Sequence, residues 1–267
     1  VDLYDPQNAS WKQLASMTGP RYAHGSVALE GKLYAVGGHG ATYQALDTAE
    51  VYDPQTDGWQ PLAKMSTARY AFGLAVVGGR IYAIGGRISR STLELVEAYD
   101  PQLGSWAPVA SMSVKREYHA SVVLDGKIYV MGGETEDAEG GKLDTVEVYD
   151  PQADSWQRAV SMPRGLGGHA ATAMGGKIYV TGGFHQASVN SAYVYKPQTD
   201  AWTQLASMGV ARRLHASAAV GGKLYVFGGI GTSGRLSTVE VYDPASDSWA
   251  LVSSLTSARN GMAVVAL

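Results

Sequence analysis

The chain has 267 residues, a net charge of −3 and no cysteine. The absence of cysteine excludes disulfides, thiol nucleophiles and cysteine-ligated zinc, and the near-neutral charge argues against a general nucleic-acid binder. No apolar run approaches the ~20 residues of a membrane span. The 33 Gly, 16 Tyr and 6 Trp are typical of an all-β repeat protein.

The repeat is clearest in one short stretch. Residues 127–133, Lys-Ile-Tyr-Val-Met-Gly-Gly, predict a strand that ends at a double glycine. Versions of this stretch recur at residues 32–38, 80–86, 177–183 and 223–229. The tryptophans lie 46 to 50 residues apart, at Trp11, Trp59, Trp106, Trp156, Trp202 and Trp249. This regularity predicts repeated units that share a continuous core.

Each unit predicts four strands in the same order. A loop that carries Arg leads to a short apolar strand, then to a two-residue turn such as Asp125-Gly126, then to the strand that ends at Gly-Gly. Such turn pairs supply the positive φ angles of a hairpin. A variable loop precedes a third strand of the type Val-Glu-Val-Tyr-Asp-Pro, and a fourth strand begins at the tryptophan. We expect antiparallel four-stranded sheets that pack radially as a β-propeller, with Tyr and Trp between the blades.

The succession Arg-x-x-His, Lys-Ile-Tyr-Val-x-Gly-Gly, Val-Glu-Val-Tyr-Asp-Pro and Trp resembles the Kelch repeat over the whole chain. It is most similar to the Kelch domain of BTB-Kelch (Kelch-like) substrate adaptors. The resemblance implies an all-β, six-bladed Kelch propeller and one domain over residues 1–267. We place full repeats at about residues 21–65, 69–112, 116–162, 164–208 and 212–255.

The sixth blade is expected to be split between the chain ends, from residues 1–17 and 259–267. Its second strand with Gly-Gly is missing, so either residues before Val1 complete this blade or it has only three strands. A ring of five blades is the alternative, which would leave residues 1–11 without a place.

Length changes are confined to one loop of each unit. The second glycine of the pair and the third-strand Tyr are 14, 13, 16, 12 and 13 residues apart in successive units, whereas the other spacings are constant. In a meander, the strand 2–3 and strand 4–1 loops emerge at the same end, so the insertions map to one face. The resemblance implies that this face supplies peptide contacts. The predicted partner-binding residues are Tyr22, His39, Tyr70, Arg87, Arg90, Glu117, Glu134, Phe184, Arg213, Ile230, Arg235 and Asn260.

Charges that recur at the same position in most units predict internal contacts. Arginine occupies one such position and glutamate another, as at Arg69 and Glu97. We expect hydrogen-bonded Arg–Glu pairs near the loop face. The fourth unit has Leu166 and Tyr193 at these positions, and the joint loss supports the pairing.

Catalytic and metal sites are weighed against packing. Four histidines occupy one repeat position, at His24, His119, His169 and His215. Phe72 and Met262 fill the same position in other units, which favours packing over metal binding. The acidic run at residues 134–139 lacks the ligand spacing of a calcium loop. We therefore predict no enzyme, no catalytic residue, no metal and no cofactor. The alternatives are a carbohydrate-active enzyme of the sialic-acid mutarotase type and an engineered, consensus-like scaffold without a native partner.

The predicted function is recruitment of a protein or short linear peptide on the variable face, because a face with aromatic side chains and both charges suits such partners. We expect no nucleic-acid or membrane partner, a monomeric domain and a cytoplasmic location. By resemblance, the domain would be the substrate receptor of a cullin-type ubiquitin ligase adaptor.

Overall fold

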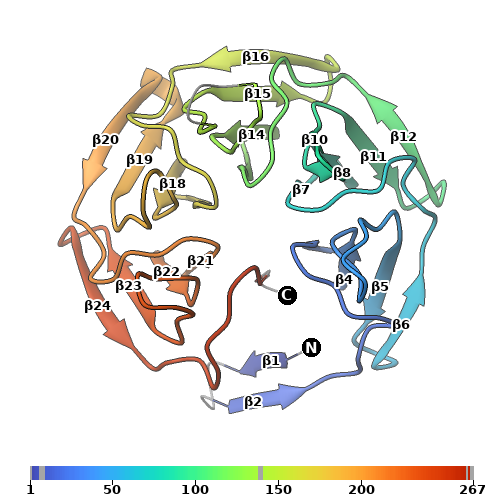
Figure 1. Ribbon diagram of the computed structural model, residues 1–267, viewed down its shortest axis with the longest axis horizontal. Coiled ribbons are helices and arrows are strands. Elements are labelled where there is room, and N and C mark those ends of the chain that lie inside the picture. Colours follow the sequence, from blue (N-terminus) through green and yellow to red (C-terminus); the bar gives the residue numbers. More distant parts are fainter. Residues whose placement is uncertain (1, 6–9, 138–140, 263, 265–267) are drawn as a thin grey trace.

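The strands form a ring of sheets around a central axis, as Figure 1 shows for the computed structural model. The structure describes residues 2–5, 10–137, 141–262 and 264. Five antiparallel sheets of four strands each form the blades, and the strands of each blade follow one another in chain order. The first strand of each blade lies nearest the axis and the fourth lies on the outside (Figure 1).

The five blades have nearly equal strand lengths. Blade one contains β3 (Gly25–Leu29), β4 (Lys32–Val36), β5 (Ala49–Asp53) and β6 (Gly58–Pro61). Blade two contains β7 (Gly73–Val77), β8 (Arg80–Ile84), β11 (Val96–Asp100) and β12 (Ser105–Val109), with a small hairpin of β9 (Arg87–Ile88) and β10 (Ser91–Thr92) between its second and third strands. Blade three contains β13 (Ala120–Leu124), β14 (Lys127–Met131), β15 (Val146–Asp150) and β16 (Ser155–Ala159).

The last two complete blades follow the same pattern. Blade four contains β17 (Ala170–Met174), β18 (Lys177–Thr181), β19 (Ala192–Lys196) and β20 (Ala201–Leu205), and a single 3₁₀ turn, η1 (Pro197–Thr199), joins its third and fourth strands. Blade five contains β21 (Ala216–Val220), β22 (Lys223–Phe227), β23 (Val239–Asp243) and β24 (Ser248–Val252).

The tight turns between first and second strands have the predicted geometry. Asp125 and Gly126 have φ of 51° and 73°, and Leu124 pairs with Lys127 across the turn. The double glycine has a structural role different from that of the turn glycine. Gly132 has φ of 61°, and a Cβ there would lie 2.7 Å from the Leu166 carbonyl oxygen of the next blade. The first glycine of the pair therefore lets neighbouring blades approach backbone to backbone.

The core lies between blades, as the sequence predicted for the tyrosines and tryptophans. One cluster joins Tyr82 and Ile84 of blade two to Ile128 and Tyr149 of blade three. Trp156 packs against Tyr149 with ring centroids 5.0 Å apart and donates its Nε1–H to the Ala110 carbonyl of the preceding blade at 2.7 Å. Each sheet thus covers its neighbour, and this burial provides most of the stability of the ring.

The expected six-bladed fold is wrong, because only five four-stranded blades are present among the described residues. At the position expected for the split blade, β1 (Asp2–Asp5) and β2 (Ser10–Gln13) form a sheet of two strands only, between blades one and five in Figure 1. The expected first strand at the other chain end is absent over residues 259–262. The rest of that prediction concerns residues 1, 6–9, 263 and 265–267, which lie outside the described residues.

The reason is the pairing rule of the meander. In a complete blade, the first strand forms its hydrogen bonds only with the second, as β13 does with β14. Among the described residues, no second strand lies beside residues 259–262, so the backbone groups of these four residues have no ladder to join.

No helix in the described part of the chain is long and apolar enough to cross a membrane.

Candidate functional site

The two ends of the ring differ. We call the end formed by the strand 2–3 and strand 4–1 loops the loop face, and the opposite end, formed by the short turns, the turn face. On the loop face, the residue after the double glycine pairs with backbone on both sides, so three chain segments lie side by side in every blade. Directly opposed residues of such pairs project their side chains to the same side. We call these three residues the triplet of the blade.

The three residue types of the triplet differ from blade to blade. They are Tyr22–His39–Ala45, Tyr70–Arg87–Thr92, Glu117–Glu134–Lys142, Gly167–Phe184–Ser188 and Arg213–Ile230–Arg235. The pairing itself is constant. In blade five, for example, the Arg213 N–H donates to the Ile230 carbonyl at 3.0 Å and the Ile230 N–H donates to the Arg213 carbonyl at 2.8 Å. One backbone frame therefore presents a different surface in each blade.

The structure brings ten of the twelve predicted partner-binding residues into these triplets. The other two lie nearby. Arg90 is exposed at the turn of the β9–β10 hairpin. Asn260 follows blade five, and its side-chain amide donates to the Tyr22 hydroxyl at 3.4 Å, which joins the two ends of the chain.

The third member of each triplet is absent from the predicted set, except for Arg235. These residues are Ala45, Thr92, Lys142 and Ser188. A constant spacing marks them: each lies seven residues before the third-strand Tyr and is followed by Leu or Val. The N–H of that Leu or Val donates to the carbonyl of the second glycine, as Leu143 does to Gly133 at 2.9 Å. The spacing therefore locates the residue at which each variable loop rejoins the paired backbone segments of the triplet.

Buried ion pairs support the loop face from below, as predicted. The Arg116 guanidinium is fully buried and donates to Glu147 at 2.8 Å and to the Gly132 carbonyl at 2.7 Å. The other Glu147 oxygen accepts the Ser113 backbone N–H at 2.8 Å. Each pair thus ties the strand 4–1 loop to the end of the second strand. The same arrangement links Arg21 with Glu50, Arg69 with Glu97 and Arg212 with Glu240.

Blade four uses apolar side chains at the same two positions. Leu166 and Tyr193 are both buried. The Leu166 backbone keeps the role of the arginine: its carbonyl accepts the Gly133 N–H at 2.8 Å, as the Arg116 carbonyl accepts that of Gly86 at 2.9 Å. The joint replacement therefore preserves the frame.

An open series of five backbone hydrogen bonds runs around the axis on the loop face. Ala71 donates to Ala23, Tyr118 to Ala71, Gly168 to Tyr118, Leu214 to Gly168 and Gly261 to Leu214, with N···O distances between 2.7 and 3.0 Å. The non-glycine members adopt positive φ, for example 50° at Tyr118. This conformation is costly for most residues and persists where the surroundings fix it. The strand 4–1 loops are thereby held at one level.

The first two triplets meet through aromatic rings. The centroids of His39 and Tyr70 lie 3.7 Å apart, with a tilt of 31°. Burial lowers the pKa of His39 and raises the pKa of Tyr70, so each ring favours its neutral form. Tyr22 remains 40% exposed beside them. This side of the loop face is an aromatic surface with hydrogen-bonding edges.

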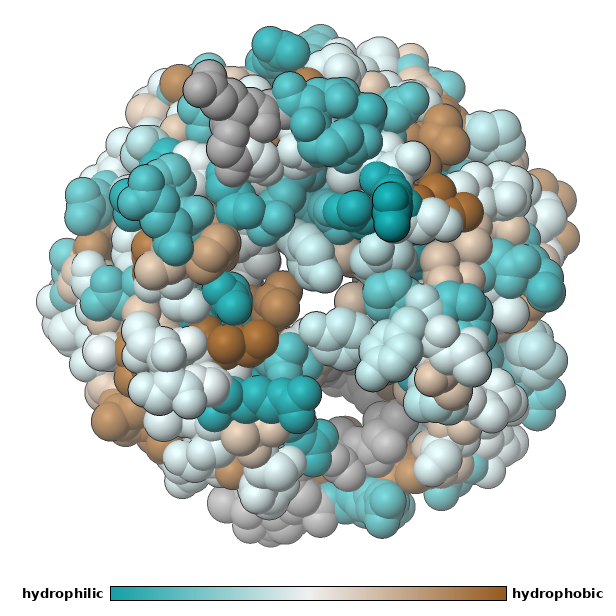
Figure 2. Space-filling model, viewed as in Figure 1, coloured by the Kyte–Doolittle hydropathy of each residue, from teal (hydrophilic) through white to brown (hydrophobic). Residues whose placement is uncertain are grey.

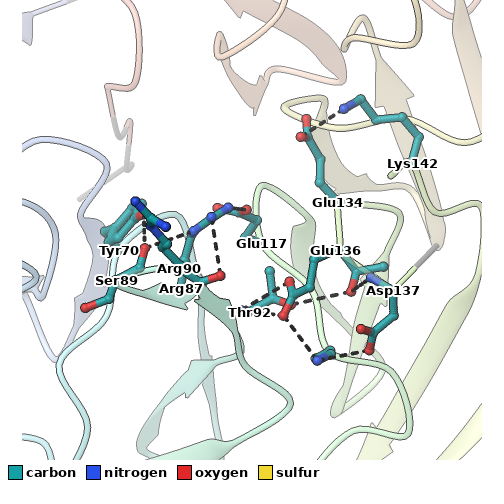
Figure 3. Close-up of polar contacts among 12 residues, drawn as sticks. Tyr70, Arg87, Ser89, Arg90, Thr92, Glu117, Glu134, Glu136, Asp137 and Lys142 are labelled. Carbon is teal, nitrogen blue, oxygen red and sulfur yellow. Dashed lines mark hydrogen bonds and ion pairs between the residues drawn. The ribbon is translucent and has the colours of Figure 1, made fainter. Parts of the chain in front are cut away.

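The acidic side chains of blade three already have partners, and Figure 3 shows them directed at neighbouring groups. Glu117 pairs with Arg87, and Glu134 pairs with Lys142 at 2.8 Å. Glu136 accepts from Thr92 and pairs with Lys115 at 3.1 Å. The Thr92 hydrogen bond is the main reason why the pKa of Glu136 is lowered to about 2. Asp137 also pairs with Lys115, so the described acids of the run at residues 134–139 are compensated within the chain, and Glu139 lies outside the described residues.

Glu117 is the most buried of these acids, with only 4% of the residue exposed. Burial raises the pKa of its carboxyl above the ordinary value, although Arg87 favours the charged form. The Arg87 guanidinium also donates to the Ser89 carbonyl at 3.2 Å. Arg87 therefore orders its own hairpin and is less available to a partner than Arg90.

Blades four and five combine apolar and cationic groups. The Arg213 guanidinium lies over the Phe184 ring at 4.5 Å from its centroid, and the Lys142 ammonium lies at 5.2 Å. The Ser188 hydroxyl donates to the Ile230 carbonyl at 3.2 Å, which links the two triplets. Figure 2 shows brown and teal surfaces side by side over these blades, next to the central opening.

The repeated histidines pack between blades. His119, His169 and His215 are buried, and burial is the main cause that lowers the pKa of His169 to about 4 and that of His215 to about 3. They are therefore neutral at pH 7. Among the described residues, no group of three or more His, Asp or Glu side chains is placed to hold a metal ion.

A hollow of about 340 Å³ is lined by the inner strands of blades one to three, mainly with apolar side chains such as Val27, Leu74 and Val123. Ser121 is its one hydroxyl-bearing lining residue.

A comparison with protein families adds to this geometry. The family model described as Attractin/LZTR1 beta-propeller matches residues 33–266. No curated protein matches the chain.

Proposed function

We propose a protein-binding function from one premise: the chain belongs to the Attractin/LZTR1 beta-propeller family. A propeller of this family is suited to protein interaction. The proposed binding surface is the loop face. The partner is a protein or a short linear peptide. The twelve residues predicted from sequence, together with Lys142 and Ser188, are its proposed contacts.

One observation carries this proposal. The triplets differ in every blade, although the backbone frame that holds them is the same. A residue that only stabilises the fold would be expected to recur, as the Arg–Glu pairs do in four blades. Side chains that vary on a rigid frame suit recognition of one asymmetric partner.

We further propose that binding occurs without catalysis. The carboxylates of Glu117, Glu134 and Glu136 are engaged by Arg87, Lys142 and Thr92. General acid–base chemistry needs such groups to converge on a reacting atom, whereas the hollow at the inner strands of blades one to three is lined mainly by apolar side chains. The arrangement favours a broad recognition surface over a reaction site.

The resemblance to BTB-Kelch adaptors extends the proposal to substrate recruitment for a cullin-type ubiquitin ligase in the cytoplasm. In that arrangement, the propeller would bind the substrate and other domains would bind the ligase.

Display selection of random peptides tests the function. The parent domain is compared with a loop-face variant, Arg90→Glu/Arg213→Glu, and with a turn-face control, Arg80→Glu/Lys223→Glu. The control reverses two charges that form exposed ion pairs with Asp100 and Asp243. We expect a shared motif that is enriched on the parent and on the control and is lost on the loop-face variant.

Two outcomes would overturn the proposal. The first is a folded parent that enriches no motif. The second is a motif lost on the turn-face control but kept on the loop-face variant, which would place the binding surface at the other end of the ring.

A further inference from the structure

The blades differ in whether their charged loop-face side chains have ion-pair partners within the chain. In blade three, each of the two triplet carboxylates has a basic partner: Arg87 pairs with Glu117 and Lys142 with Glu134. In blade five, the two triplet arginines have no carboxylate within ion-pair distance among the described residues. Blade five therefore carries two uncompensated positive charges on the loop face, in addition to the exposed Arg90 of blade two.

The backbone places these arginines as a pair. Ile230 forms a bridge with Arg213 on one side and with Arg235 on the other. Opposed residues in such bridges lie about 5 Å apart and share a side of the sheet. The backbone positions of Arg213 and Arg235 therefore flank that of Ile230, and the three side chains leave the same side of the paired segments. Arg213 is partly buried and Arg235 is exposed.

Blade four supplies the adjoining apolar surface. The Phe184 ring is covered in part by the Arg213 guanidinium at 4.5 Å, and the Ser188 hydroxyl fixes the edge of the Ile230 strand. A guanidinium held over a ring loses less side-chain freedom when it binds an anion. Phe184, Ile230 and the two arginines thus form one contiguous surface.

The neighbouring charges limit what this surface accepts. The Glu134 side chain lies over Gly167, where a Cβ would collide with it. The Glu134 carboxylate forms an ion pair with Lys142. Arg164 is exposed on the segment that precedes Gly167, and the His185 Nδ1–H donates to the Gly165 carbonyl at 3.0 Å. Apart from Glu134, the described groups around Phe184 and Ile230 are neutral or basic.

We propose that blades four and five bind an acidic linear segment of a partner protein, in which carboxylates flank an apolar side chain. The apolar side chain lies on Ile230 and Phe184, and the carboxylates accept bidentate hydrogen bonds from Arg213 and Arg235. This inference rests on the proposed function and specifies the partner that the loop face takes.

The test uses a peptide enriched by display on the parent domain, synthesised with a fluorophore. Its affinity is measured for the parent, for Arg213→Gln/Arg235→Gln and for the matched control Arg90→Gln/Arg164→Gln. The second variant removes two other exposed arginines of the loop face. We expect an acidic peptide that binds the Arg213→Gln/Arg235→Gln variant at least about tenfold more weakly than the parent, with a clearly smaller loss for the Arg90→Gln/Arg164→Gln variant.

The salt dependence gives a second readout. Because the contacts are charged and partly exposed, raising the salt concentration should weaken binding to the parent more than binding to Arg213→Gln/Arg235→Gln. Thermal unfolding of the variants separates lost contacts from lost fold. A phosphoserine version of the peptide should bind no more tightly than the carboxylate version.

Failure of this inference is distinct from failure of the proposed function. No enriched peptide on a folded parent overturns both. An enriched motif without acidic residues, or an acidic motif that the control loses and Arg213→Gln/Arg235→Gln keeps, overturns the acidic-segment proposal and leaves loop-face binding standing. A phosphoserine peptide that binds more than about tenfold tighter overturns the choice of carboxylates.

Discussion

The loop face and the turn face of the ring are built from the same repeats. They differ in whether the exposed side chains recur from blade to blade. On the turn face, the same contacts recur: Lys127 pairs with Asp150 at 3.0 Å, as Lys223 does with Asp243 at 2.9 Å. On the loop face, the buried ties recur but the side chains above them change. Repetition thus marks stability, and variation above a repeated frame marks the candidate for recognition.

The buried ion pairs should give the largest effect on stability. Replacing Arg116 by Met leaves the buried Glu147 carboxylate without its cation, and removal of one partner from a buried pair costs about 3–5 kcal/mol. We expect that loss in the free energy of unfolding, measured by urea denaturation.

Blade four provides the matched control for this prediction. The double variant Arg116→Leu/Glu147→Tyr copies its Leu166 and Tyr193, and we expect it to recover most of the loss. A double variant as unstable as the single one would show that the frame of blade three depends on the ion pair itself.

Acid should destabilise the ring through the buried histidines. Burial lowers the folded-state pKa of His169 to about 4, whereas an unfolded histidine titrates near about 6.5. The unfolded state then binds more protons below the unfolded pKa, so stability is lost as the pH falls from about 6.5 towards 4. Each such histidine should cost about 2 kcal/mol at pH 5.

The control for acid sensitivity is His169→Phe, because Phe72 fills the equivalent place in blade two. Urea denaturation at pH 7 and pH 5 should show a smaller difference for this variant than for the parent. An unchanged difference would assign the acid sensitivity to other groups.

A missing turn contact in blade two offers a smaller gain. In the other blades an Asp accepts from the third-strand Tyr, as Asp154 does from Tyr149 at 2.7 Å, and from a backbone N–H of the previous blade. Gly104 occupies this position in blade two with φ of 64°, close to the 45° of Asp154. Gly104→Asp should raise the melting temperature, with a gain of about 0.5–1.5 kcal/mol. A lower melting temperature would contradict the equivalence of the turns.

The exposed ion pairs of the turn face should contribute least. The Lys127 and Asp150 side chains are 45% and 32% exposed, and such pairs contribute about 0–1 kcal/mol. Lys127→Ala should therefore leave the urea midpoint almost unchanged. A loss above about 2 kcal/mol would give this pair a structural role like that of Arg116 and Glu147.

Sequence reasoning predicted the four-stranded blade correctly, but it predicted six blades where the described residues form five. The hairpin at Asp125 and Gly126, the inter-blade tryptophans and the Arg–Glu pairs all depend on contacts that each repeat encodes locally. The sixth blade depended on pairing between distant segments. Six tryptophans indicated six units, but a blade needs four paired strands, and β1 and β2 supply two.

The candidate site was predicted in part for the same reason. Residues next to a repeated landmark, such as His39 after its double glycine, could be placed on the loop face. The pairing of loop acids could not, because Glu117 meets Arg87 from a neighbouring blade and Lys142 returns to Glu134 across a variable loop. Only the structure shows that blade three compensates its charges and blade five does not.

Hydrogen–deuterium exchange, with and without the peptide enriched on the parent domain, tests the loop-face assignment most directly. Bound peptide should slow exchange in the loop segments, such as residues 182–189 and 228–236, and leave the turns at residues 125–126 and 221–222 unchanged. Protection confined to the turns would contradict the assignment of recognition to the variable face.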